Sequence, residues 1–247
     1  MARLTFVAVF GIMEVAVKLS KQLFFGGSKM NNAWSELNKS VQTQLKKEAT
    51  FSEGLNTLYT LREKLFAELC GFKKELSRED FNAMPFVNAD GYHSKTIAYS
   101  IWHIFRIEDI VAHTLIAGDE QILFSGKYNE SIGAPIITTG NELVKQQIAD
   151  FSRTLDIEQL YRYISDVKNS TEKILKCLSF SELKHKISEE KKECLRALNV
   201  VSTDENAVWL IGYWCGKDIR GLIQMPFSRH WIMHVEASLR IKNKLQK

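Results

Sequence analysis

Apolar residues recur every three or four positions through most of this chain, and few residues interrupt them. Among the 247 residues only 3 are proline and 13 are glycine. The first periodic run contains Trp34, Leu37, Val41 and Leu45, a spacing that is typical of an amphipathic helix. A turn-rich β fold needs many more breaking residues. The sequence therefore predicts an all-α protein built from long helices.

The chain divides at a glycine-rich break near its start. Residues 4–13 form an apolar run that is much shorter than the roughly 20 residues of a membrane span. The breaker at 26–28, Gly-Gly-Ser, separates this run from the first helical pattern. We expect residues 1–29 to be an N-terminal extension, which is either a weak signal peptide or sequence upstream of a native start at Met30. Residues 30–247 are expected to form a single helical domain.

Charge and cysteine content exclude several classes of protein. Lys and Arg number 33 against 29 Asp and Glu, which leaves a net charge of +4 that is scattered along the chain. Nucleic-acid binding requires a clustered basic face, so we expect no nucleic-acid partner, and no membrane association either. The cysteines have no C-x-x-C spacing and are expected to be buried, reduced thiols of a cytoplasmic protein: Cys70, Cys177, Cys194 and Cys215.

Three histidines are candidates for one metal site. His230 and His234 lie four residues apart in the last predicted helix, which places them on one face. His103 lies in a helix predicted over residues 95–117, where small polar residues such as Ser100 form a stripe on an otherwise apolar surface. Three imidazoles with an open fourth position are typical of a catalytic metal site. Taken alone, however, a histidine in an apolar helix is also typical of a hydrogen-bonded core residue.

The other histidines and the nearest carboxylate fit the site less well. His93 and His113 are ten residues on either side of His103, which turns each by about 80° away from its face. His185 lies in a charged segment and is expected at the surface. Glu108 is about 140° from His103 around the helix, so we expect a structural or solvent-facing role for it rather than metal ligation.

Several further elements follow from the pattern. A long connection over residues 120–137 is typical of a functional loop, and Thr138 and Thr139 are expected to cap the helix that follows it. A helix is predicted from about 204 to 222, and the Met-Pro-Phe sequence at 225–227 is expected to break the chain before the last helix. The charge-dense region 181–201 is expected to be a solvated helix or loop insertion.

Two segments carry a resemblance to a known family. Residues 100–108, S-I-W-H-I-F-R-I-E, and residues 229–234, R-H-W-I-M-H, resemble the second and last helices of the DinB-like (YfiT-like) metalloenzyme superfamily. In that family one histidine of the second helix and an H-x-x-x-H pair of the last helix bind a divalent metal. The resemblance maps His103, His230 and His234 onto these three ligands.

The resemblance extends from about residue 50 to the end of the chain. It implies an up-and-down four-helix bundle, here with an extra N-terminal helix and a charged insertion. One departure concerns the sequence after the last histidine, where many relatives have an Arg-Gly-Gln-like run and this chain has Val235-Glu236-Ala237. This departure leaves the metal ligands in place and puts any particular catalytic activity in doubt.

The implied function is a metal-dependent transferase or hydrolase that uses Zn, Ni or Fe. A bound metal would lower the pKa of a water or thiol and so create a nucleophile near neutral pH. The expected partner is a small-molecule substrate such as a low-molecular-weight thiol, and a homodimer is an open alternative to a monomer. The rival interpretation is a catalytically silent scaffold in which the metal is structural. Because each imidazole must be neutral to coordinate, binding is expected to weaken below about pH 6.5.

Overall fold

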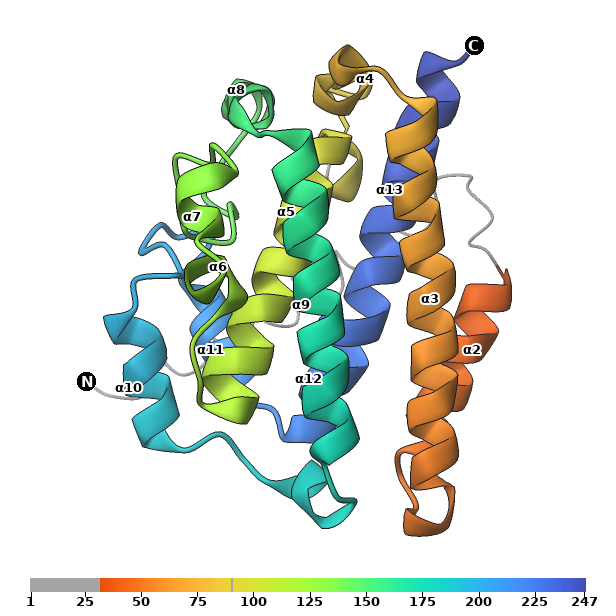
Figure 1. The fold of residues 1–247 in the computed structure, drawn as a ribbon, viewed down its shortest axis with the longest axis vertical. Coiled ribbons are helices and arrows are strands. Elements are labelled where there is room, and N and C mark those ends of the chain that lie inside the picture. Colours follow the sequence, from red (N-terminus) through yellow and green to blue (C-terminus); the bar gives the residue numbers. More distant parts are fainter. Residues whose placement is uncertain (1–31, 90) are drawn as a thin grey trace, which may run out of the picture.

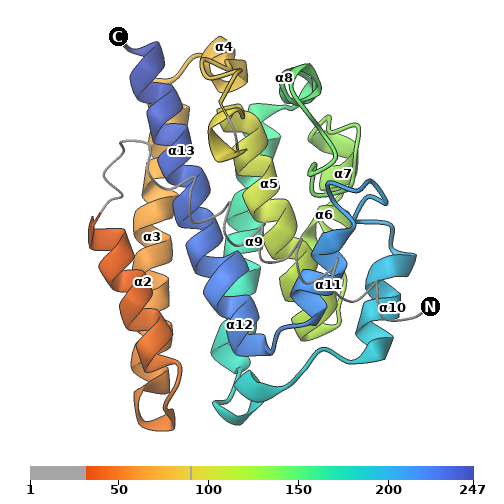
Figure 2. The same cartoon turned by 180° about the vertical axis from the view of Figure 1, so that it is seen from behind.

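Four long helical segments lie side by side and form the frame of the molecule (Figures 1 and 2). The computed structural model describes residues 32–89 and 91–247, and every regular element within them is a helix. The frame consists of α3 (Phe51–Glu75), α5 (Ile97–Asp109) continued by the π-helical η4 (Ile110–Ala117), α9 (Ile157–Cys177), and α12 (Ile219–Gln224) continued by the π-helical η6 (Met225–Arg229) and by α13 (His230–Leu245). The prediction of an all-α protein is confirmed for the described residues.

Shorter elements surround this frame. They are α2 (Asn32–Gln44), η2 (Glu48–Thr50), α4 (Arg78–Asn82), η3 (Gly91–His93), α6 (Ile122–Ser125), α7 (Tyr128–Ser131), α8 (Gln146–Thr154), η5 (Ser181–Lys184), α10 (Glu189–Ala197) and α11 (Trp209–Cys215). The helix α2 packs along α3 through the buried Trp34 and Val41, so the expected additional helix at the N-terminal end of the bundle is present. The extension expected over residues 1–29 lies outside the described residues. No helix in the described part is long and apolar enough to cross a bilayer.

The frame helices do not simply alternate in direction along the chain. In Figure 1 both α5 and α9 run downward, whereas α3 and α13 run upward. The segment between α5 and α9 carries α6, α7 and α8 back to the end of the molecule at which α5 begins, so α9 starts beside the start of α5. The strict up-and-down order predicted from the sequence is therefore wrong, because it ignored this return crossing.

The helix that carries His103 lies at the centre of the molecule. Every residue of α5 is buried, and the Thr96 hydroxyl caps its start by accepting a hydrogen bond from the Tyr99 backbone N–H at 3.0 Å. Its π-helical continuation ends at Gly118, whose φ of 79° is the left-handed conformation that glycine adopts without strain. The helix predicted over residues 95–117 is thus confirmed to within two residues.

The last helix begins earlier than the proline suggests. The predicted break at 225–227 is wrong, because the chain passes from α12 through a π-helical turn directly into α13. Pro226 stands at the start of that turn, where a missing backbone N–H is tolerated. The helix predicted from 204 to 222 is in turn divided into α11 and α12, and the Asp218 side chain caps α12 by accepting from the Gly221 N–H at 2.8 Å.

The charged region at 181–201 is more than a solvated insertion. Most of its ionic side chains are exposed, as expected, but Leu195 is completely buried. The Lys191 ammonium donates to the carbonyl oxygens of Leu115 and Ile116 at 3.0 and 2.6 Å. The helix α10 thereby satisfies the carbonyl end of the central helix.

The cysteines are less buried than the sequence predicted. Cys215 is buried and Cys70 half-buried, whereas Cys177 and Cys194 are exposed, and all four are free thiols. The prediction of four buried thiols is wrong for the exposed pair, because both lie on solvent-facing turns of amphipathic helices.

A buried ion pair joins three of the frame helices. The Arg62 guanidinium on α3 donates to both carboxylate oxygens of Glu108 on α5, at 2.8 and 2.9 Å. The Trp231 indole N–H on α13 donates to the same carboxylate at 2.8 Å, and the guanidinium lies 4.4 Å from the centre of the Trp231 ring. All three side chains are completely buried. Glu108 therefore has the structural role expected of it, although it faces the core and not solvent.

Replacing Glu108 by glutamine tests how much the frame depends on this pair. Glu108→Gln leaves the buried Arg62 charge poorly compensated, so we expect the free energy of unfolding to fall by about 3 kcal/mol. Glu158→Gln, which removes the partner of Lys73 in an exposed pair, should cost less than about 1 kcal/mol. Urea denaturation of the metal-free protein measures both values. Losses of equal size would contradict a special role for the buried pair.

Candidate metal centre

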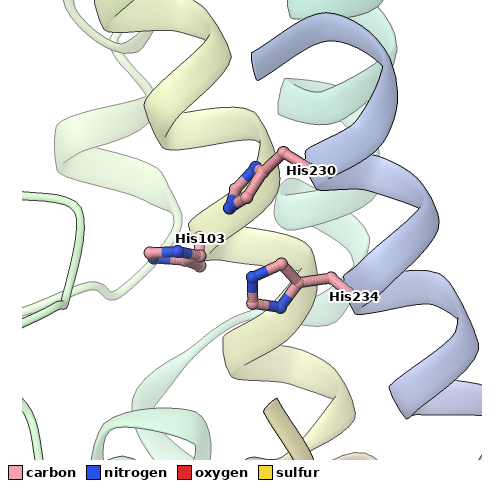
Figure 3. Close-up of side chains that lie close together, drawn as sticks. All are labelled: His103, His230 and His234. Carbon is pink, nitrogen blue, oxygen red and sulfur yellow. The ribbon is translucent and has the colours of Figure 1, made fainter. Parts of the chain in front are cut away.

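The structure brings His103, His230 and His234 together (Figure 3). His103 projects from α5, and the other two project from successive turns of α13 on the face that packs against α5. One ring nitrogen from each residue can be chosen so that all three lie within 4.8 Å of one another. The side chains are 5%, 6% and 2% exposed, respectively, so the cluster lies just beneath the surface.

The spacing of the rings fits a single small ion. The ring centres of His103 lie 5.1 Å from His230 and 4.8 Å from His234, and the centres of the two rings on α13 are 4.6 Å apart. A tetrahedral ion with bonds of about 2.0–2.1 Å to imidazole holds its ligand nitrogens about 3.4 Å apart. Nitrogens that lie as far as 4.8 Å apart must therefore approach by up to about 1.4 Å, which is within the reach of side-chain rotation.

His103 is held in one orientation by a backbone carbonyl and an aromatic ring. Its Nδ1–H donates to the Thr139 carbonyl oxygen at 2.8 Å, which leaves the lone pair of Nε2 available to a metal. The Tyr99 ring stacks on the imidazole with an interplanar angle of 12° and a centre distance of 5.5 Å. The Tyr99 hydroxyl donates to the Gly140 carbonyl at 2.9 Å, so the same loop fixes both rings.

The two histidines of α13 have buried nitrogens that hydrogen bonding leaves unused. Among the described residues, His230 Nδ1 and both ring nitrogens of His234 have no hydrogen-bond partner. An unpaired buried polar group destabilises the fold, so such groups are rare in native proteins unless a ligand or water satisfies them. Three converging imidazoles with these free nitrogens fit a divalent cation.

Burial keeps all three imidazoles neutral. It lowers the pKa of His103 to about 4, an effect opposed by the hydrogen bond to Thr139 and supported by the nearby Lys95 charge. Burial likewise lowers the pKa of His230 and of His234 well below the ordinary value, and the neighbouring histidines add to the effect. Neutral imidazole is the form that binds metal. Protons therefore compete with a metal only at a pH well below the value of about 6.5 that the sequence alone suggested.

The long connection predicted over residues 120–137 is ordered by short helices. Just beyond its end, Thr139 provides the carbonyl to which His103 is hydrogen-bonded. The connection contains α6 and α7, and it continues without helix to the start of α8 at Gln146. Thr138 and Thr139 therefore do not cap a helix, contrary to expectation. Their hydroxyls bond instead to Glu142 and Asn141 within the same loop.

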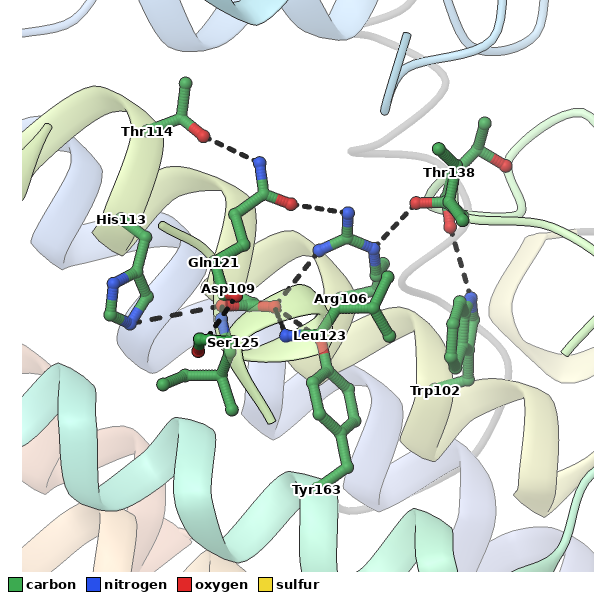
Figure 4. A network of polar contacts seen from close by, with 12 residues as sticks. Trp102, Arg106, Asp109, His113, Thr114, Gln121, Leu123, Ser125, Thr138 and Tyr163 are labelled. Carbon is green, nitrogen blue, oxygen red and sulfur yellow. Dashed lines mark hydrogen bonds and ion pairs between the residues drawn. The ribbon is translucent and has the colours of Figure 1, made fainter. Parts of the chain in front are cut away.

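A buried polar network fixes this connection to α5 (Figure 4). The Asp109 carboxylate accepts hydrogen bonds from the backbone N–H groups of Ile122 and Leu123 at 2.8 and 3.0 Å and from the Tyr163 hydroxyl at 2.9 Å. It also pairs with the Arg106 guanidinium at 3.1 Å. One carboxylate thus anchors the start of α6 to the central helix.

Arg106 extends the same network toward the metal centre. Its Nε–H donates to the Ile137 carbonyl at 2.7 Å, and its Nη2 donates to the Gln121 amide oxygen at 2.6 Å. The Trp102 indole N–H donates to the Thr138 carbonyl at 3.2 Å (Figure 4). Ile137 and Thr138 directly precede Thr139, so these bonds determine where the carbonyl that orients His103 lies.

The remaining histidines stay outside the cluster, as predicted. His93 lies against the Arg240 guanidinium at 2.7 Å, and His113 pairs with Asp119 at 2.6 Å. His185 is exposed. Helical spacing had predicted this for His93 and His113, and the charged surroundings had predicted it for His185.

Some residues lie beside the three histidines without being candidate metal ligands, and these were not predicted from the sequence. Tyr92, in η3, packs its ring edge-on against His234 at a centre distance of 4.8 Å. The role of the Thr139 backbone carbonyl could not be predicted from the sequence, because every residue has a backbone carbonyl. Lys95 precedes the N-cap of α5 and lies four and eight residues before Tyr99 and His103.

The lowered histidine pKa values predict an acid-sensitive fold in the absence of metal. Between pH 6.5 and about 4, the unfolded chain binds a proton at His103 that the native protein does not. Acidification over this range should therefore reduce the free energy of unfolding, by up to about 3 kcal/mol for this residue. In His103→Leu the loss should be smaller, and in the exposed control His185→Leu it should match the wild type. Urea denaturation with a chelator present, repeated across this pH range, measures the slope, and identical slopes in all three proteins would refute the assignment.

Comparison with known proteins provides no relative from which a function could be transferred. No protein-family model matches the chain, and no curated protein matches it. The assignment of a function therefore rests on the residues of this chain and on their geometry.

Proposed function

We propose that this protein is a metal-dependent enzyme, of transferase or hydrolase type, whose divalent ion is held by His103, His230 and His234. The observation that supports it most is the convergence of three buried, neutral imidazoles with ligand nitrogens within 4.8 Å. Buried nitrogens without hydrogen-bond partners support it further. The residues present fit Zn, Ni or Fe, all of which imidazole binds well.

Membership of the DinB-like superfamily is part of the same proposal. It is supported by the frame of long helices and by the placement of one histidine on α5 and a pair at the start of α13. The parallel course of α5 and α9 departs from the strictly alternating bundle that the resemblance implied, because the chain order is up, down, down, up.

The chain contributes orientation and a water-poor surrounding to the chemistry. A divalent ion in this place supplies a Lewis acid that lowers the pKa of a water or thiol bound to it. Thr139 orients His103, and Tyr92 packs against His234 on α13. No carboxylate of the described residues joins the histidine group, so we assign no general base.

The rival interpretation is a silent scaffold in which a metal clips α5 to α13. A structural zinc site normally has four protein ligands, whereas this group has three among the described residues. The two helices are also joined without metal, because Trp231 on α13 donates to Glu108 on α5. A metal is therefore not needed to hold them together, and this favours the enzyme.

Alanine substitution of each ligand tests the metal site. Replacing His103, His230 or His234 by alanine leaves two imidazoles, so the zinc content of the purified protein should fall from about one per chain to a small fraction of that value. His185→Ala and His113→Ala should retain the wild-type content, because neither residue belongs to the cluster. Elemental analysis after dialysis measures the content. Full zinc content with unchanged affinity in His103→Ala would refute the three-ligand site.

Thiol binding distinguishes the enzyme from the scaffold. Cobalt absorbs visible light according to its ligands, so 2-mercaptoethanol that binds an open coordination position should change the spectrum of the cobalt-substituted protein. The cobalt form of the wild type is expected to respond at millimolar thiol, and the spectrum should revert when the thiol is dialysed away. A spectrum that does not change while cobalt remains bound would support the scaffold.

A further inference from the structure

We propose that Lys95 forms a subsite beside the three histidines that binds a carboxylate group of the ligand. This inference rests on the proposed metal site and goes beyond it by naming the chemical class of the ligand. Its basis is the position of a half-buried ammonium group at a cluster that contains no acidic side chain.

Lys95 reaches the metal centre by way of Tyr99. Its ammonium nitrogen lies 5.1 Å from the centre of the Tyr99 ring, and that ring stacks on His103. One aromatic ring, that of Tyr99, therefore links the ammonium group to His103.

This ammonium group lacks the partners that other buried cations have. Arg62 pairs with Glu108, Arg106 with Asp109, and Lys168 with Glu63 and Glu172. Within the described residues, Lys95 forms neither an ion pair nor a hydrogen bond, and burial lowers its pKa below the ordinary value. A half-buried charge without a counter-charge is unfavourable, so this ammonium group stabilises a bound anion more strongly than it would in water.

Two buried hydroxyl groups provide independent support. Ser100 and Ser238 are 0% and 1% exposed, and neither hydroxyl has a hydrogen-bond partner among the described residues. Ser100 lies about 60° around α5 from His103, and Ser238 about 40° around α13 from His234. The two helices pack together and run in opposite directions, so both hydroxyls lie one turn from the ligands toward the same end of the site. That is also the end from which Lys95 approaches, since it precedes Ser100 on the chain.

The charge of the site selects an anion, and its hydrogen-bond donors suit a carboxylate. Three neutral imidazoles leave the charge of a divalent ion uncompensated, and Lys95 adds a further positive charge. A carboxylate accepts hydrogen bonds through two oxygens, which suits one ammonium group and neighbouring hydroxyl donors. Phosphate is tetrahedral and bulkier than a planar carboxylate, which is unfavourable in a site whose histidines are 2–6% exposed.

Acetate binding to the cobalt-substituted protein tests the subsite. Metal content is measured first, and acetate is then titrated while the visible spectrum is recorded, with acetamide as the uncharged probe. Lys95→Met should keep the wild-type cobalt content and bind acetate about tenfold more weakly, or worse, because a charge-assisted contact is lost. Lys95→Arg retains the cation and should bind acetate nearly as well as the wild type. Lys46→Met, an equal charge change at an exposed residue, should have no effect.

The outcomes separate this proposal from the metal site itself. A wild-type protein that takes up no cobalt would refute the metal site and the subsite with it. Normal cobalt content with equal acetate affinity in wild type and Lys95→Met would refute the subsite alone, as would acetamide binding as tight as acetate binding. A loss of cobalt from Lys95→Met would show that the lysine supports the metal and not the ligand. Tighter binding of inorganic phosphate than of acetate would overturn the assignment to carboxylates.

Discussion

The architecture depends on two consecutive buried carboxylates at the end of α5, where that helix continues into η4. Glu108 and Asp109 are both completely buried, and they point to different sides of the helix. Glu108 pairs with Arg62 on α3, and Asp109 pairs with Arg106 and anchors the start of α6. Buried charges are tolerated only where partners satisfy them, so each carboxylate specifies a single arrangement of the elements that it joins.

These carboxylates determine the metal centre without belonging to it. Glu108 accepts from Trp231, the residue next to His230, and so fixes the rotation of α13 that directs both of its histidines toward α5. Arg106, held by Asp109, fixes the loop whose Thr139 carbonyl orients the imidazole of His103. The three histidines lie on two helices, and the ion pairs of Glu108 and Asp109 thus fix their arrangement.

The features that could be predicted from the sequence lie within single helices, whereas the features that could not be predicted depend mostly on residues far apart in the chain. The spacing of His230 and His234 and the polar stripe around His103 are properties of single helices, and together with the family resemblance they selected the three of six histidines that the structure brings together. The partner of Glu108 could not be predicted, because Arg62 lies 46 residues away in a different helix. Pro226 misled the prediction because a π-helical turn accommodates it without a break. The parallel course of α9 depends on the return crossing before it, which periodicity does not reveal.

The contrast between satisfied and unsatisfied polar groups gives the strongest argument for a ligand at this place. Around Arg106 and Asp109 the guanidinium and the carboxylate both have several hydrogen-bond partners, as buried charges require. One turn away, His230, His234, Ser100 and Ser238 contribute five buried polar atoms without a partner among the described residues. Each such atom costs about 1–3 kcal/mol relative to a bonded one. The other unpartnered buried atoms of the described residues are spread over several helices and loops, whereas these five belong to α5 and α13, which pack together, and a bound ion and its ligand can offset their cost.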